Sequence, residues 1–221
     1  MTTTRESGPR ARIDTTMMYA VHDAFQRDLD TLVALAGTGD VDALRTGWNR
    51  FRTFLHIHHT AEDTHLWPVL EDKLTRTGRA AGLAVLSSME AEHTGLTALL
   101  DAMDAALAEP APPPRRVAHA RRLADALTAH CEHEEEAALP LVEELLTPQE
   151  WRAFGDEQRH RLGRGGAATF LPWLLDGADE DRRRKVLGYL PPPARLLYRA
   201  VWRPRYLRRP RWEPRAAAPV R

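Results

Sequence analysis

The sequence predicts an all-α fold: an antiparallel four-helix bundle followed by a helical, arginine-rich C-terminal extension. Two observations indicate helices. Apolar residues recur at steps of three and four over four long stretches, and the alternating pattern of strands is almost absent. A third observation indicates the bundle. Two segments that begin at His58 and His130, 72 residues apart, have nearly the same pattern, so a helix pair is repeated.

The first two helices are expected on either side of the glycine-containing loop at residues 37–39. The seam of the first helix consists of Met18, His22, Phe25, Leu29 and Leu32. The second helix, which Asp40 is placed to cap, has a seam of Val41, Leu44, Trp48, Phe51, Leu55, His58 and Glu62.

The third and fourth helices are expected after Gly78 and after the proline-rich run at residues 110–114. The third seam consists of Leu86, Met89, His93, Leu96, Leu100, Met103 and Leu107. The fourth consists of Val117, Ala120, Leu123 or Ala124, Leu127, His130, Glu134, Ala137 and Leu141. Pro68 and Pro140 are expected to kink or restart the helices in which they lie.

Four segments follow from these patterns. The predicted bundle covers residues 12–147, after a flexible N-terminus at residues 1–11. A helical extension is expected over residues 148–194, opened by Thr147 and Pro148.

Residues 195–221 form a basic aromatic tail with nine arginines and one acid. The tail therefore carries a charge of +8, and the remainder of this neutral chain carries −8. We expect the tail to fold back on the acidic remainder; contact with nucleic acid or a membrane is the less favoured alternative.

Composition points to a cytoplasmic protein. No run of residues approaches the roughly eighteen apolar residues of a membrane span. The N-terminal residues lack the apolar core of a signal peptide. The single cysteine, Cys131, excludes an internal disulfide framework and favours a reducing compartment. Any metal site must therefore depend on histidine and carboxylate side chains.

Six polar residues occupy the apolar seams rather than the solvent-facing sides of the helices: His22, His58, Glu62, His93, His130 and Glu134. His and Glu four residues apart lie on one helix face. Burying such groups without partners is costly, and a shared metal ion removes that cost. A lone histidine in a seam is usually structural, but six residues in a duplicated frame favour a metal site.

Four imidazoles and two carboxylates are too many for one tetrahedral zinc ion. They fit two metal ions, with Glu62 and Glu134 as bridges. Oxygen and imidazole ligands favour iron or manganese over copper(I), which prefers sulfur. Helix bundles often hold such centres in their cores.

The pattern closely resembles the hemerythrin-like (HHE cation-binding) domains over about residues 12–147: His22, His58-x-x-x-Glu62, His93, His130-x-x-x-Glu134. The resemblance implies a four-helix bundle around a non-haem di-iron centre, with these six residues as ligands. It also implies bridging by carboxylates and by an oxo or hydroxo group. Manganese is the second choice of metal.

The sequence departs from the oxygen-carrying members in one respect. Those have five histidines, two of them four residues apart on the third helix, whereas Met89 and Thr97 flank His93 at that distance here. A missing ligand would favour reaction or sensing over reversible oxygen carriage. Candidates to replace it, or to orient the ligands from outside, are His59, His133 and Glu135.

Three functions remain open from the sequence. The chain could bind or sense O2, NO or redox state. It could be a catalase-like enzyme that degrades peroxide. Alternatively, it could be an interaction protein with a structural metal and the basic tail as its binding surface.

Overall fold

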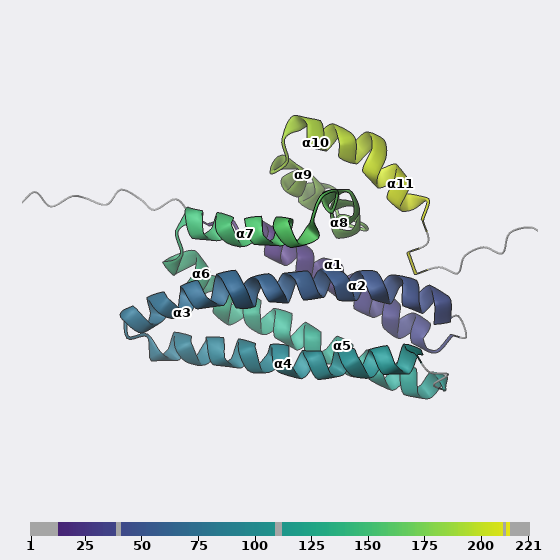
Figure 1. Cartoon of the computed structure of the whole chain (residues 1–221), viewed down its shortest axis with the longest axis horizontal. Helices are drawn as coiled ribbons and strands as arrows, with labels where there is room; N and C mark the ends of the chain where they lie inside the picture. Colours follow the sequence, from purple (N-terminus) through teal and green to yellow (C-terminus); the bar gives the residue numbers. More distant parts are fainter. Residues whose placement is uncertain (1–12, 39–40, 109–111, 210, 213–221) are drawn as a thin grey trace, which may run out of the picture.

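The computed structural model describes residues 13–38, 41–108, 112–209 and 211–212, and all regular secondary structure in these ranges is helical. Four long helices run side by side, with neighbours antiparallel (Figure 1): α1 (Thr16–Ala36), α2 (Val41–Ala61), α4 (Ala80–Ala108) and α5 (Pro113–His133). They pack in the cyclic order α1, α2, α4, α5 and back to α1. We call them the core helices.

Some sequence predictions lie outside the described residues. They are the flexible N-terminus at residues 1–11, the Asp40 cap, most of the loop before Pro113 and the end of the tail from residue 213. Within the described residues, the predicted seams are largely buried between the core helices. Phe25, Phe51 and Leu127, for example, are fully buried.

Pro68 and Pro140 do not break their helices, because a wider turn precedes each of them. The five-residue π turns η1 (Glu62–Leu66) and η2 (Glu134–Ala138) lead directly into α3 (Trp67–Arg76) and α6 (Leu139–Leu145). A proline ring clashes with the carbonyl group four residues earlier and donates no hydrogen bond. A π turn accommodates both defects by adding one residue to the turn.

The extra residue corrects the predicted fourth seam. Ala137 and Leu141, which α-helical spacing placed in the core, are only partly buried. Ala138 and Val142 are fully buried instead. The buried face is therefore displaced by one residue beyond η2.

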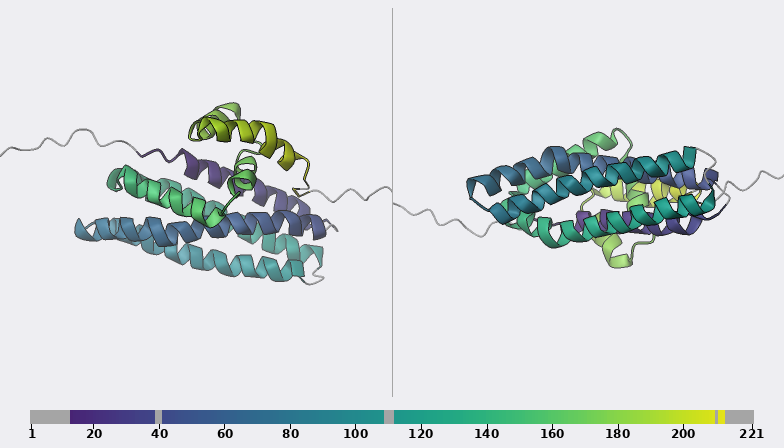
Figure 2. Two further views of the ribbon diagram at one scale, coloured as in Figure 1. Left: turned by 45° about the horizontal axis from the view of Figure 1, so that its top comes forward. Right: turned by 90° about the horizontal axis from the view of Figure 1, so that it is seen from below.

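The extension consists of short helices stacked over α1 and α2 (Figure 2). They are α7 (Pro148–Leu162), α8 (Ala167–Leu174), α9 (Glu180–Gly188), α10 (Pro192–Leu197), the π turn η3 (Tyr198–Trp202) and α11 (Arg203–Leu207). A capping box formed by Thr147 and Glu150 begins α7. α10 spans the predicted boundary between residues 194 and 195.

Trp173 of α8 attaches the extension to the core helices. Its ring is fully buried and lies 5.4 Å from the ring of Phe25 and 4.6 Å from that of Phe54. The indole N–H donates a 2.8 Å hydrogen bond to the buried carboxylate of Asp28 on α1. The extension therefore shares one hydrophobic core with α1 and α2.

The described end of the tail returns to α2. The buried ring of Trp212 packs against Gly47, and Arg211 forms a 2.8 Å ion pair with Asp176. None of the described helices has the length and apolar composition needed to cross a lipid bilayer.

The substitution Gly47→Ala tests the contact between Trp212 and α2. A β-carbon at Gly47 would lie 2.1 Å from the Trp212 ring, so the ring must move. We expect a loss of about 1–3 kcal/mol in the free energy of unfolding, measured by urea denaturation, together with red-shifted tryptophan emission. Gly95→Ala on α4 is the control, because nothing lies within 4 Å of its added carbon. Equal stability of the two variants would contradict this packing.

Candidate metal centre

The six polar residues of the predicted seams meet between the core helices. Each is at most 7% exposed. The first helix of each pair contributes one residue, and the second helix with its following π turn contributes two: His22 (α1), His58 (α2), Glu62 (η1), His93 (α4), His130 (α5) and Glu134 (η2). Both glutamates are the first residues of their π turns.

The side chains form two groups with metal-binding geometry. The first consists of His22, His58, Glu62 and Glu134, and the second of His59, His93 and His130. Within each group the potential ligand atoms lie within 4.8 Å of one another. The two groups adjoin at the consecutive histidines of α2.

His59 was expected outside the ligands or as a substitute, and the structure places it within the second group. Its ring stacks on that of His93 at 4.0 Å, with 15° between the planes, and lies 5.2 Å from that of His130. α2 thus places a fifth histidine in the candidate centre, where the third helix offers none beyond His93. Consecutive helical residues point about 100° apart, so His58 and His59 can face two different ions.

The nitrogen spacing fits a metal ion in each group. The Nε2 atoms of His22 and His58 are 3.3 Å apart, and those of His93 and His130 are 3.2 Å apart. Two imidazoles bound at right angles to one ion, through bonds of about 2.1 Å, would be separated by about 3.0 Å.

The glutamates lie between the groups. Oε1 of Glu62 is 3.0 Å from Nε2 of His58, and its Oε2 is 3.8 Å from Nε2 of His93. Oε2 of Glu134 is 3.2 Å from Nε2 of His22 and 4.0 Å from Nε2 of His130. Each carboxylate therefore approaches one histidine of each group, as a bridging ligand would.

Unsatisfied polar atoms supply an independent indication of a cation. Both carboxylate oxygens of Glu62 and of Glu134 are buried without a hydrogen-bond partner. Buried polar groups are normally paired, and an unpaired buried carboxylate is especially costly. Two cations between these oxygens and the imidazole nitrogens would satisfy them, so the residues fit the metals that the sequence predicts.

An outer layer of carboxylates orients three of the histidines. The Nδ1–H groups of His22, His93 and His130 each donate a 2.8 Å hydrogen bond, to Glu135, Asp63 and Glu92 respectively. Such bonds leave Nε2 directed toward the metal and raise its basicity. His133 lies further out, where its Nδ1 is 2.7 Å from the second oxygen of Glu92.

Asp63 and Glu92 were not identified from the sequence as partners of the ligands. The sequence feature that could have identified them is that each directly neighbours a predicted ligand, as Glu135 does. Each carboxylate, however, pairs with a histidine on a different helix. Asp63 thereby connects η1 to α4, Glu92 connects α4 to α5, and Glu135 connects η2 to α1.

The buried charges strongly shift the pKa values of the metal-free centre. Burial lowers the pKa of His22, but Glu134 and Glu135 outweigh it and raise the pKa to about 10. Burial raises the pKa of Glu134, but His22 outweighs it and lowers the pKa to about 2. Burial and the charge of Glu134 raise the pKa of Glu62 well above its usual value. Burial lowers the pKa of His58 to about 3.

At neutral pH the metal-free centre therefore has a protonated His22 paired with an ionised Glu134, while the raised pKa of Glu62 favours its neutral form. Burial lowers the pKa of His59 well below its usual value, and the neighbouring imidazoles, chiefly that of His93, lower it further. His59 is therefore neutral. Metal ions bind only the deprotonated forms of these ligands.

One family model matches the chain. The model described as "Hemerythrin HHE cation binding domain" covers residues 14–142, more than half of the 221 residues. The matched range contains every residue of the two ligand groups and ends before α7. No curated protein and no solved structure shows a significant match to the chain.

The protonation state gives one prediction. Metal must displace the proton of His22, whose pKa is about 10, so binding of Mn²⁺ to the metal-free protein at pH 7 should release at least one proton. Affinity should rise with pH, because metal and protons compete for the same atoms. Calorimetry in two buffers of different ionisation enthalpy measures the release. Uptake that is independent of pH between 6 and 8 would contradict these protonation states.

The outer carboxylates give a second prediction. Glu92→Ala removes the acceptor that orients His130, so metal affinity should fall by about 10–100-fold, as measured by competition with a chelator. Glu90→Ala is the matched control, because this glutamate lies on the exposed side of α4. The same affinity in both variants would show that Glu92 does not support the centre.

Proposed function

Because the chain belongs to the hemerythrin HHE cation-binding family, we propose that it is a non-haem di-iron protein that binds or senses O2, NO or redox state. The centre lies between α1, α2, α4 and α5, whose cyclic packing supports a hemerythrin-like four-helix bundle. The small ligand would bind at the metal pair. The single cysteine supports a reducing, cytoplasmic location.

The observation that carries the proposal is the pair of ligand groups with glutamates between them. One ion would be held by His22 and His58, and the other by His59, His93 and His130. Glu62 and Glu134 would bridge them. Iron would supply reversible electron transfer and affinity for diatomic ligands at this position.

The two groups are unequal, which bears on where a small ligand would bind. The first offers two imidazoles and the second offers three. With shared bridges, the ion beside His22 and His58 would have one ligand fewer and could accept an exogenous molecule. Reversible ligand binding is therefore no longer disfavoured by a missing histidine.

The donor set supports iron, with manganese as the second choice, because all the ligand atoms are imidazole nitrogens and carboxylate oxygens. Cys131 belongs to neither group. Burial raises the pKa of its thiol well above the usual value, which keeps it protonated and unreactive.

Catalase-like peroxide degradation is the less supported candidate. It would require a proton donor near the open side of the centre, and the sequence offers Glu135 and His133 for this role. Glu135 accepts the hydrogen bond of His22, and His133 is bonded to Glu92. Glu135 is therefore engaged with a candidate ligand and His133 with an outer carboxylate, so neither is a free proton donor, which favours binding or sensing.

Iron content and the visible spectrum of protein from iron-supplemented cells test the proposal. We expect two irons per chain and near-ultraviolet charge-transfer bands that bleach on reduction. His59→Ala should lower iron occupancy and alter these bands, because one ion loses an imidazole. His56→Ala, on the exposed side of α2, is the matched control and should match the wild type.

Two results would contradict parts of the proposal. A single zinc, or no metal, would exclude the di-iron centre and leave the metal as structural or absent. An unchanged spectrum and iron content in His59→Ala would exclude only the role of His59. Oxygen evolution from added peroxide, lost in His93→Ala, would favour the catalase-like function instead.

A further inference from the structure

The continuous helix formed by α10, η3 and α11, residues 192–207, is the outermost element of the molecule (Figures 1 and 2). We call it the outer helix. It lies on the side of the extension opposite to α4 and α5. No acidic residue occurs between Asp181 and Glu213, so the outer helix and its surroundings in sequence are entirely basic or neutral.

One face of the outer helix is fixed to the protein. Tyr198 is buried, and Trp202 and Tyr206, four and eight residues later, are partly buried on the same side. The Tyr206 hydroxyl donates a 3.1 Å hydrogen bond to Asp176, and Arg195 donates a 2.8 Å bond to the Leu190 carbonyl. The aromatic rings are therefore turned inward.

The opposite face exposes large aliphatic side chains. Leu196, Leu197 and Leu207 are 67%, 45% and 44% exposed. Only two other large hydrophobic residues in the described ranges are comparably exposed, and both are tyrosines. Single exposed leucines are common on soluble proteins, but three on one short helix indicate a contact surface.

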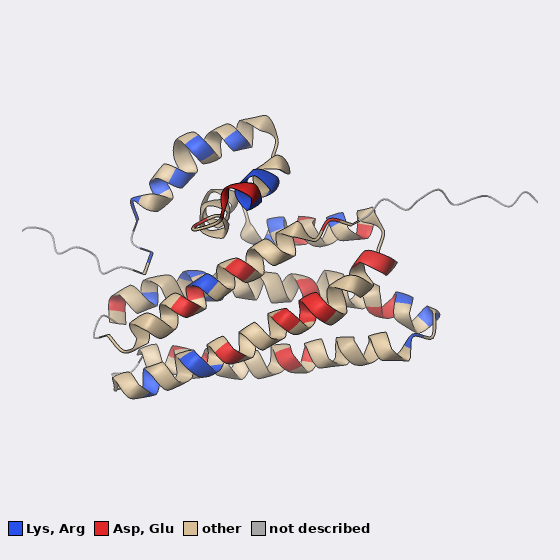
Figure 3. Cartoon of the chain, turned by 180° about the vertical axis from the view of Figure 1, so that it is seen from behind, with Lys and Arg blue, Asp and Glu red and all other residues tan. Residues whose placement is uncertain are grey.

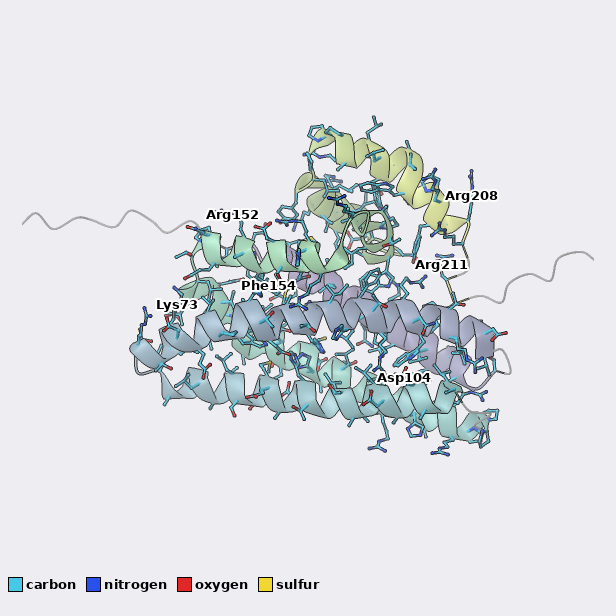
Figure 4. The ribbon with its side chains drawn as sticks, in the orientation of Figure 1. Lys73, Asp104, Arg152, Phe154, Arg208 and Arg211 are labelled. Atoms are coloured by element: carbon cyan, nitrogen blue, oxygen red, sulfur yellow. The ribbon has the colours of Figure 1, made fainter. Side chains whose placement is uncertain are left out.

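Arginines without acidic partners flank these leucines. Arg199, Arg203, Arg205, Arg208 and Arg209 are exposed and form no ion pair within the described part of the chain. Figure 3 shows basic positions along this helix with no acidic ones among them, and Figure 4 shows Arg208 at the outer edge of the molecule. On α9, by contrast, Arg183 and Arg184 pair with acids of their own helix.

We propose that the outward face of the outer helix binds the surface of an anionic lipid bilayer. Exposed leucines flanked by arginines are what an interfacial helix requires: the leucines enter the boundary between headgroups and acyl chains, and the arginines contact lipid phosphates. The helix would lie in the plane of the membrane surface without crossing it.

The exposed side chains favour lipid over nucleic acid. Single-stranded nucleic acid is bound by arginines together with aromatic rings on which bases stack. The rings of Tyr198, Trp202 and Tyr206 face the protein instead, and the exposed apolar residues are aliphatic. A nucleic acid would leave these leucines in water, whereas a bilayer removes them from it.

Vesicle co-sedimentation of the full chain tests the proposal. The protein should bind vesicles of phosphatidylcholine and phosphatidylglycerol, and not vesicles of phosphatidylcholine alone. Arg199→Gln with Arg208→Gln should weaken binding by about 25-fold, at about fivefold for each arginine. Leu196→Ser with Leu207→Ser should weaken it by about tenfold. All four side chains are exposed, so the fold should be retained, as circular dichroism would verify.

Arg121→Gln with Arg122→Gln on the exposed side of α5 is the charge-matched control and should bind nearly as well as the wild type. If this control weakens vesicle binding as much as the outer-helix variant does, binding depends only on the net charge of the protein, and the proposal is overturned. Full vesicle binding by the leucine variant combined with competition from an oligonucleotide would also overturn it and would indicate nucleic acid. A dimer that the leucine substitutions convert to a monomer, without vesicle binding by the wild type, would indicate a second copy of the chain.

Discussion

The structure depends on two carboxylates, Glu62 and Glu134, buried at the point where the core helices meet. No hydrogen bond satisfies the oxygens of either, although imidazole nitrogens lie 3.0 Å from Glu62 and 3.2 Å from Glu134. In an apolar interior this arrangement is sustained by positive charge or by protonation. In the metal-free protein the imidazolium of His22 supplies positive charge, and the raised pKa of Glu62 favours protonation. Two bound cations would neutralise both carboxylates in place of the imidazolium and the proton. Metal binding would therefore be coupled to the stability of the core.

The remainder of the centre follows from this constraint. The outer carboxylates hold three histidines and join η1 to α4, α4 to α5 and η2 to α1, so each of these three histidines is oriented by a neighbouring helical segment. His58 lacks such a partner, and its ring instead lies 5.5 Å from that of Phe25. Phe25 in turn contacts Trp173, so the extension packs behind His58, a candidate ligand that no outer carboxylate orients.

Helical periodicity located the core helices and brought the six seam residues together, because spacing alone determines which face of a helix a side chain occupies. Two features could not be predicted from the spacing of residues and became evident only in the structure. His59 neighbours a candidate ligand in sequence and therefore points away from it on an isolated helix, but the second group of candidate ligands lies in that direction. Ala138 replaces Ala137 in the core because a π turn changes the angle per residue, which α-helical counting cannot anticipate.

The three π turns share one design: each ends two residues before a proline, at Pro68, Pro140 and Pro204. The third holds none of the candidate ligands, so the proline rather than the metal accounts for the turn. In the first two, the turn separates a helix into two phases. Before the turn, the candidate ligands face the centre of the bundle. After it, the buried face is set by the apolar residues that pack at the end of the molecule. Because the π turn allows the buried face to differ on its two sides, the orientation of one segment does not fix that of the other.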